Sequence, residues 1–289
     1  MHTRIVVRSL VLSVALALCS GPAYAQVGAT TPKQKPATTQ PPATPQKPDT
    51  AQKPYEPQVG QGGKDVVWVP TPQALVDKML DMAKVTPSDF VMDLGSGDGR
   101  TVITAAKRGA RATGIEYNPD MVELSKRNAE AAGVTDKATF MKADLFETDL
   151  SKAQVITMFL LPSINMKLRP TILNLKPGTR IVSNTFTMED WQADETTTVT
   201  DGCSSSWCTA LFWIVPAKVA GVWNTPSGAL TLTQKFQMVS GTLGTQAVQG
   251  KLNGAQIELT AGSQKWTGMV DGNSIKFSAP SAMTATKKQ

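Results

Sequence analysis

The sequence predicts two folded parts, an α/β domain built on a doubly wound parallel sheet and a small all-β domain after it. Strand-like and helix-like segments alternate at short spacing over residues 65–217, which is typical of right-handed β-α-β crossovers. From residue 218 to residue 289 the helix signals end, and residues 248–257 match residues 266–275 at a period of 18. Such a repeat in a region without helix signals favours antiparallel strands.

Two segments precede the α/β domain. Residues 1–25 combine two arginines with a short apolar core and a small-x-small site before Gln26, which predicts a cleaved signal peptide and an exported, periplasmic or secreted protein. The alternative is an uncleaved N-terminus that retains the protein at the membrane. Residues 26–64 are rich in Pro, Thr and Gln and predict a disordered linker. We expect no membrane span after signal removal, because no later stretch is long and apolar enough.

The composition excludes several kinds of chemistry. The single histidine, His2, lies in the predicted signal peptide, so a mature chain could form no Ser-His-Asp triad and no His-rich zinc site. We predict no metal site. Signal removal takes away two of 29 basic residues and none of 23 acidic ones, so the net charge falls from +6 to about +4. This mild charge, without a dense basic stripe, argues against a nucleic-acid partner.

The mature chain retains two cysteines, Cys203 and Cys208. An even pair in an oxidising compartment favours a local disulfide over two free thiols. We therefore predict a bridge within the segment that joins the last two strands of the α/β domain.

The predicted elements follow one another closely. The first helix covers residues 71–84, with Thr71 as its N-cap and Pro72 at its first helical position. Further helices are expected at 100–107, 120–132 and 163–175, between parallel strands at 90–93, 112–117, 139–143, 155–161 and 180–186. An antiparallel hairpin at 196–200 and 209–215 should close the sheet edge.

In the C-terminal region, Asn253-Gly254 and Asp271-Gly272 are favoured pairs for two-residue hairpin turns. The region therefore predicts a small antiparallel meander or barrel. We expect Trp223 and Trp266 to belong to its core.

The first strand of the α/β domain ends in a glycine-rich turn. Asp93 is followed by Gly95, Gly97 and Gly99, and a helix-compatible segment begins at Arg100. Such a turn lets backbone N–H groups at a helix start approach a nucleotide-like ligand that a Cβ would hold off. Dinucleotide oxidoreductases use a similar turn, but Arg100 occupies the place of their third glycine.

This stretch resembles motif I of the class I S-adenosylmethionine-dependent methyltransferases, which have a seven-stranded, Rossmann-like sheet. Glu116 ends the second strand roughly 20 residues past the turn, where an acid can accept ribose hydroxyls, and Asp144 ends the third strand, where such enzymes contact adenine. The resemblance implies S-adenosyl-L-methionine as cofactor, bound by Asp93, Gly95, Ser96, Gly97, Gly99, Glu116, Asn118, Asp144 and Leu145.

Four segments are similar to the small lysine methyltransferases of the ATP synthase c-subunit and adenine nucleotide translocase type: residues 68–72, 93–100, 116–119 and 184–186, the last with Trp191. The similarity implies methyl transfer to a protein lysine. Aromatic faces suit a methylated ammonium, and the candidate substrate residues are Trp68, Pro70, Phe159 and Trp191. A small-molecule methyltransferase and a non-catalytic exported binding or scaffold protein are the alternatives. The sequence assigns no catalytic residue and no oligomeric state.

Overall fold

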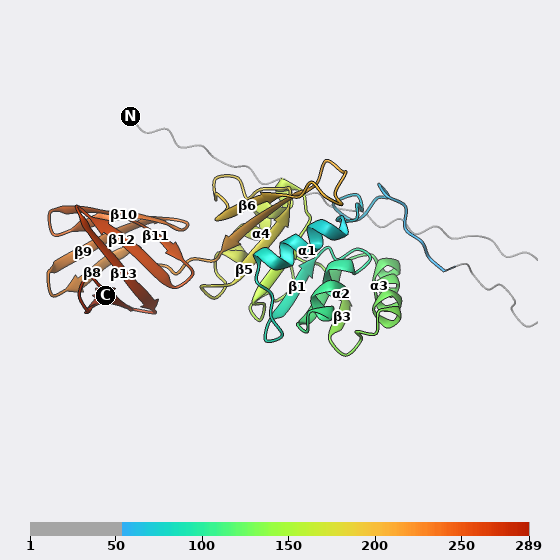
Figure 1. The fold of residues 1–289 in the computed structure, drawn as a ribbon, viewed down its shortest axis with the longest axis horizontal. Helices are drawn as coiled ribbons and strands as arrows, with labels where there is room; N and C mark the ends of the chain where they lie inside the picture. The colour runs from blue at the N-terminus through green and yellow to red at the C-terminus, as the bar shows by residue number, and fades with distance from the viewer. Residues whose placement is uncertain (1–53, 289) are drawn as a thin grey trace, which may run out of the picture. The chain divides into compact units, whose positions relative to one another are not determined.

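The structure is a computed structural model that describes residues 54–288. The predicted signal peptide and most of the predicted linker lie outside these residues. The described chain forms a seven-stranded sheet with helices and a closed barrel of eight strands (Figure 1). Within residues 54–288, no helix has the length and apolar character that crossing a membrane would require.

The sheet has the strand order β3-β2-β1-β4-β5-β7-β6. Strands β1 to β5 are parallel, whereas β7 pairs antiparallel with both β5 and β6. The carboxyl ends of the five parallel strands therefore meet the amino end of β7 at one edge of the sheet. This confirms the predicted doubly wound sheet with its edge hairpin. The strands are β1 Phe90–Leu94, β2 Arg111–Glu116, β3 Ala138–Lys142, β4 Val155–Met158, β5 Arg180–Asn184, β6 Glu195–Thr198 and β7 Thr209–Ile214.

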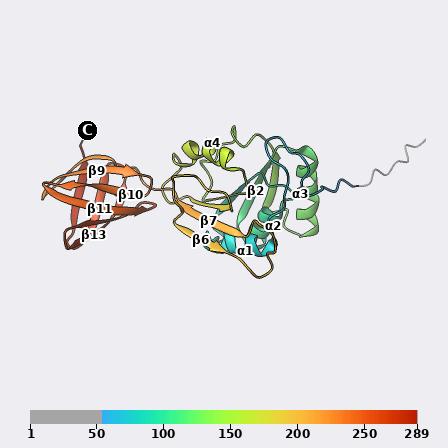
Figure 2. The ribbon, with the colours of Figure 1, turned by 90° about the horizontal axis from the view of Figure 1, so that it is seen from above.

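Helices cover both faces of this sheet (Figure 2). Alternate residues of β1 serve the two faces: Val91 packs in one apolar core with α1, α2 and α3, and Met92 packs in a second core with α4. A parallel strand buried on both faces reads as a nearly continuous apolar run, which explains the sequence of β1 and of β4. The helices are α1 Gln73–Met82, α2 Arg100–Lys107, α3 Pro119–Ala131 and α4 Pro162–Ile172.

The start of α1 differs from the prediction. Pro72 occupies the cap position, the helix begins at Gln73, and no side chain caps it. Thr71 is buried instead, and its hydroxyl accepts a hydrogen bond from Nδ2 of Asn184 at 3.3 Å. The Thr71 side chain is thus bonded to the end of β5, which leaves it unable to cap the helix.

The C-terminal strands close into a barrel, which decides between the predicted meander and barrel. Strand β8 pairs with β15 as well as β9, so the sheet has no free edge. Trp223 and Trp266 lie in its apolar core, as expected. The strands are β8 Gly221–Thr225, β9 Gly228–Lys235, β10 Met238–Leu243, β11 Gln246–Asn253, β12 Gln256–Ala261, β13 Gln264–Asp271, β14 Ser274–Ala279 and β15 Met283–Lys287.

The two predicted hairpin turns lie one residue later than expected. Asn253 pairs with Gln256, and Asp271 pairs with Ser274, so each strand keeps the residue that was expected in the turn. The glycine that follows takes the first loop position, with φ of 60° at Gly254 and 54° at Gly272. A positive φ at the first loop position alone is the pattern of a type II′ turn.

The last part of the predicted linker is more ordered than its composition suggests. Gly62 and Val67 form an antiparallel bridge. The backbone N–H of Gly60 donates to the carbonyl of Trp68 at 2.8 Å, and that of Trp68 donates to the carbonyl of Gln61 at 2.9 Å. These bonds fold the segment back on the residues before α1. Composition misses this because backbone pairing needs no apolar side chains.

Candidate active site

A cavity of about 580 Å³ lies at the carboxyl edge of the parallel strands. This volume is typical of small-molecule sites. The cavity wall combines residues from the ends of β1 to β5, the segment before β7, and the folded-back segment 61–71. All the residues predicted to contact the cofactor line it except Gly99, as do three of the four substrate candidates: Trp68, Pro70 and Phe159.

The turn after β1 requires glycine for two reasons. Gly95, Gly97 and Gly99 have φ values of 74°, 54° and 83°, which residues with a Cβ rarely adopt. A Cβ at Gly97 would also lie 2.6 Å from Nε1 of Trp68, and one at Gly99 would lie 2.7 Å from the Phe140 ring. The turn therefore leaves bare backbone facing the cavity at the start of α2.

The carboxylate of Glu116 is fixed at both oxygens. Oε2 accepts the backbone N–H of Gly97 at 3.0 Å, and Oε1 accepts that of Asn118 at 2.9 Å. Asn118 in turn caps α3, because its Oδ1 accepts the N–H of Asp120 at 2.9 Å. Glu116 thus joins the glycine turn to the start of α3 while lining the cavity.

Asp93 is buried at the end of β1, with 6% of its surface exposed. Burial raises the pKa of its carboxyl to about 7, and the charges of Asp98 and Glu116 act in the same direction. The hydroxyl of Thr157 opposes this shift by donating to Oδ1 at 2.6 Å. Asp93 is therefore a carboxyl that changes protonation near neutral pH at the cavity wall.

Asp144 has a partner that the sequence did not indicate. Nζ of Lys64 lies 2.5 Å from its Oδ2 and also sits over the Tyr117 ring, 4.7 Å from the centroid. Hydrogen bonds from Lys64 and the Phe146 N–H hold the pKa of Asp144 below its usual value. Lys64 belongs to the predicted linker. Because the composition of that segment predicts disorder, the sequence did not indicate this contact.

Aromatic side chains form another part of the cavity wall. The rings of Phe159 and Phe186 stack with centroids 5.8 Å apart, and Trp207 lies 6.1 Å from Phe159. Phe159 follows β4, Phe186 follows β5, and Trp207 precedes β7. We name these three residues the aromatic wall. Phe186 and Trp207 are absent from the predicted site residues, because only the antiparallel placement of β7 beside β5 brings Trp207 to this edge.

Trp191 is the one substrate candidate that the structure places elsewhere. It is fully buried, and its ring stacks on Phe236 at 5.8 Å and packs against Trp213 at 6.2 Å. Nε1 of Trp213 donates to the carbonyl of Trp191 at 2.8 Å. Trp191 is therefore a core residue and does not line the cavity. Its role in the family-like segment is to pack against neighbouring rings.

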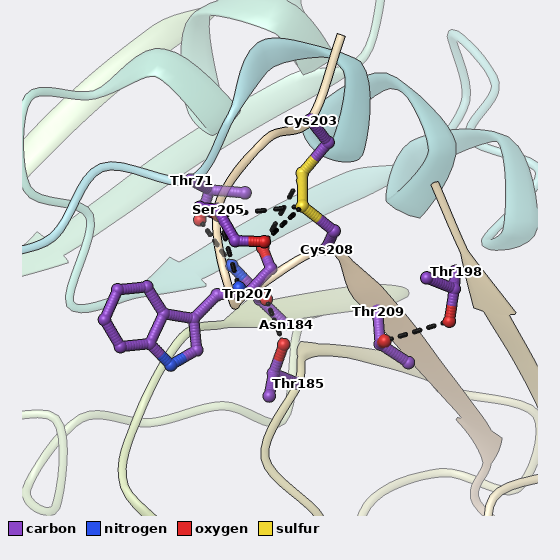
Figure 3. Close-up of a disulfide and its surroundings, with 9 residues drawn as sticks. All are labelled: Thr71, Asn184, Thr185, Thr198, Cys203, Ser205, Trp207, Cys208 and Thr209. Carbon is purple, nitrogen blue, oxygen red and sulfur yellow. Dashed lines mark hydrogen bonds between the residues drawn. A yellow bond between two sulfur atoms is a disulfide. The ribbon is translucent and has the colours of Figure 1, made fainter. Parts of the chain in front are cut away.

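Cys203 and Cys208 form a disulfide in the segment between β6 and β7 (Figure 3). Both cysteines are buried against the core that contains α1. The bridge closes a short ring within this segment, and the burial of both cysteines packs the segment against the domain next to the aromatic wall.

Comparison with known proteins identifies the domain that carries this cavity. Residues 93–195 match the model of the ANTKMT methyltransferase domain. Over 140 residues the chain is 46% identical to a protein-lysine N-methyltransferase of Saccharolobus islandicus, a match that covers 47% of this chain and 87% of that protein. The chain belongs to this family of S-adenosylmethionine-dependent methyltransferases. S-adenosyl-L-methionine is its cofactor, as the resemblance implied.

Two further comparisons describe the same methyltransferase domain. The chain is 35% identical over 119 residues to the adenine nucleotide translocase lysine N-methyltransferase of Mus musculus, covering 40% of this chain and spanning 52% of that protein's length. Among solved structures, an RNA methyltransferase from Salinibacter ruber in complex with S-adenosyl-L-homocysteine is 46% identical, with a TM-score of 0.49 and coverage of 52% of this chain and 96% of that one.

The cavity of this methyltransferase fits its cofactor. The Ser96 hydroxyl is buried without a hydrogen-bond partner among the described residues, and a buried polar group of this kind calls for a ligand or water. Gly97 lines the cavity without a side chain, and Trp68 packs so closely against it that a Cβ would not fit. Glu116 presents a carboxylate that two backbone N–H groups already orient.

Proposed function

We propose that this methyltransferase transfers a methyl group from S-adenosylmethionine to the side-chain nitrogen of a protein lysine. The observation that carries the proposal is the order of groups along one sheet edge. The carboxylates of Asp144 and Glu116 end β3 and β2, the glycine turn follows β1, and the aromatic wall follows β4 and β5. The names of the Saccharolobus islandicus and Mus musculus relatives support the same acceptor.

This order assigns the two ends of the cavity. We assign the nucleoside to the β3–β2 end, where Glu116 would accept both ribose hydroxyls and Asp144 and Leu145 would contact the base. The cavity-lining part of the turn, from Asp93 to Gly97, would hold the amino-acid portion together with Asn118. The acceptor would then enter from the β4–β5 end, where the aromatic wall lies.

The chain's own contribution to transfer is binding and orientation. The bound cofactor supplies a methyl group that its sulfonium already activates. The protein aligns a nitrogen lone pair with that group and excludes water from the cavity. A lysine, with a reference pKa of about 10.4, can bind as a cation but must lose its proton before transfer, and the positive charge of the sulfonium together with the apolar Leu160 would favour the neutral amine. No histidine follows His2 in the chain, and we assign no general base.

We further propose that the enzyme acts outside the cytoplasm. The signal-like residues 1–25 support this location, and so does the Cys203–Cys208 disulfide, since such bridges persist in oxidising compartments. Cell fractionation tests it. We expect the mature protein, with an N-terminus at Gln26, in the periplasmic or secreted fraction, and full-length protein confined to the cytoplasm would reject the location.

The acceptor is tested by formation of S-adenosylhomocysteine. Purified enzyme and cofactor are incubated with proteins extracted from the cell envelope, with the same proteins after chemical acetylation of lysine, and with envelope metabolites. We expect product with the untreated proteins alone. Product with metabolites alone would support a small-molecule methyltransferase, and no product with any acceptor would support a non-catalytic binding protein.

A further inference from the structure

The loop between β6 and β7 places one aromatic ring in the cavity, and a buried disulfide lies on the opposite side of the same loop. Trp207 lines the cavity, while its neighbour Cys208 is 7% exposed and its bridge partner Cys203 is 8% exposed. Figure 3 shows the Trp207 ring pointing away from the disulfide. The cross-link therefore lies in the apolar core, and the indole projects from the other side of the same loop.

The bridge restrains this loop together with a backbone bond, in which the Val199 N–H donates to the carbonyl of Cys208 at 2.8 Å. Ser204, Ser205 and Ser206 are exposed, and a run of exposed serines buries little apolar surface. The Trp207 N–H donates to Oγ of Ser205 at 3.2 Å, a bond within the loop itself. Fixing such a loop costs conformational entropy, and a disulfide reduces that cost by restricting the alternatives. The backbone bond fixes the end of the loop at Cys208, and the bridge restricts the residues that precede Trp207.

The ring next along the wall, Phe186, follows a residue with a strained backbone. Thr185 has a φ of 59°, which is a genuine outlier for a β-branched residue. The Phe186 carbonyl accepts bonds from Oγ of Ser183 at 2.8 Å and Nδ2 of Asn165 at 3.2 Å. Strained backbone persists where surrounding contacts determine it, and such positions cluster at functional sites. The wall thus combines two segments, one fixed by hydrogen bonds to the Phe186 carbonyl and one that carries the covalent bridge.

We propose that Trp207 determines acceptor binding in this enzyme, and that the Cys203–Cys208 disulfide is a positioning element that holds its ring in the aromatic wall. The ligand class is an alkylammonium side chain, such as a methylated lysine, which binds against aromatic faces through its cation. The proposal rests on the proposed function, because it requires an amine acceptor. It implies that reduction of the bridge weakens acceptor binding and leaves the cofactor site, built on β1, β2 and β3, unchanged.

The test uses two blocked tripeptides that differ in charge alone at the central side chain. One carries Nε,Nε-dimethyl-lysine and the other carries the neutral hydrocarbon of similar shape. Each is titrated by calorimetry into the oxidised protein saturated with S-adenosylhomocysteine. We expect wild type to prefer the cationic peptide. Trp207→Ala should weaken its binding about fivefold or more, a size typical of a cation–aromatic contact, and Trp207→Phe should retain most of the affinity.

The disulfide is tested in the same assay. A Cys203→Ser, Cys208→Ser double variant and wild type treated with a reductant should both resemble Trp207→Ala, and reoxidation of wild type should restore binding. Ser204→Ala, a change in the same loop, is the matched control and should behave as wild type. The affinity for S-adenosylhomocysteine, titrated alone, should stay within twofold in every variant, and thermal melting verifies folding.

Four results would overturn the inference or one part of it. Equal peptide affinity in wild type and Trp207→Ala would remove the role of the ring. A parallel loss of S-adenosylhomocysteine affinity would assign the loop to the cofactor site. Retained peptide binding in the double variant would keep the proposed role of Trp207 but would show that the bridge is not needed to position its ring. If wild type prefers neither peptide, this inference fails, whereas the proposed function is decided separately by S-adenosylhomocysteine formation with the envelope proteins.

Discussion

The carboxylate of Glu116 accepts the backbone N–H of Gly97 at 3.0 Å, across the gap between the end of β2 and the turn after β1. The bond joins the two strand ends that border the cavity and fixes the carboxylate before any ligand arrives. A preorganised group binds at a lower ordering cost. Glu116 therefore has two roles, one in shaping the turn and one in binding the cofactor.

Replacement of Glu116 tests the second role. Glu116→Ala should weaken S-adenosylhomocysteine binding by about 1–3 kcal/mol, because buried ribose hydroxyls would lose their acceptor. Calorimetric titration of the mature protein measures the effect. Glu123→Ala, on the exposed side of α3 in an ion pair with Lys126, serves as the control and should bind like wild type. Equal affinity in Glu116→Ala would remove the ribose assignment.

Gly97→Ala should abolish measurable cofactor binding. Its Cβ would lie 2.6 Å from Nε1 of Trp68, in addition to the strain of a φ of 54°. Gly133→Ala is the matched control: its φ is 67°, but no atom lies within 4 Å of the new Cβ. Both variants should lose about 1–2 kcal/mol of stability from backbone strain, and the Gly97 variant should lose ligand binding as well. A Gly97→Ala protein with normal affinity would contradict the close approach described at this turn.

The buried carboxyl of Asp93 predicts a pH-dependent stability of the ligand-free protein. Its pKa is about 7 in the folded state and roughly 3.9 in an unfolded chain. The folded state therefore binds the extra proton between these values, and the stability this provides is lost as pH rises through 7. We expect the free energy of unfolding to fall by about 1 kcal/mol between pH 6 and pH 8 from this group.

Asp93→Asn should remove that slope. Denaturant unfolding at pH 6 and pH 8 measures it, with Asp136→Asn, an exposed carboxyl, as the control that keeps the wild-type slope. The Asp93 variant should be more stable than wild type at pH 8 while binding cofactor more weakly. An unchanged slope in Asp93→Asn would show that this carboxyl is ionised in the folded protein throughout the range.

Trp191 should behave as a core residue in mutagenesis. Trp191→Ala removes a fully buried ring that packs between Trp213 and Phe236, so a loss of about 3–5 kcal/mol in the free energy of unfolding is expected. Trp191→Phe should recover a large part of it. If both variants fold, their affinity for S-adenosylhomocysteine should match wild type. Weak ligand binding by a stably folded Trp191→Phe protein would return this residue to the site.

Local signals predicted which residues gather at the end of the cavity formed by β1 to β3. Asp93, Gly95, Gly97 and Glu116 lie at fixed distances from strand ends, and parallel strands bring their carboxyl ends to one edge. The residues that close the cavity carried weaker signals. Lys64 lay in a segment whose composition predicts disorder, because composition does not register the backbone bonds that fold it back.

The acceptor side depends on packing that the sequence pattern does not contain. Trp191 and Trp207 both follow the last parallel strand, and nothing in their spacing distinguishes a core ring from a cavity ring. Their different fates follow from the antiparallel β7, which brings Trp207 to the cavity edge and lets Trp213 pack on Trp191. Thr71 failed as a helix cap for a similar reason, since Asn184 engages its hydroxyl.

The most direct test of the account is the location of the transferred methyl group. The mature enzyme and the Glu116→Ala variant are each incubated with isotope-labelled S-adenosylmethionine and envelope proteins, and the labelled peptides are sequenced by tandem mass spectrometry. We predict label on lysine side-chain nitrogens with wild type and a large reduction with the variant. Label confined to other residue types or to small molecules, or no wild-type labelling at all, would contradict protein-lysine methyl transfer.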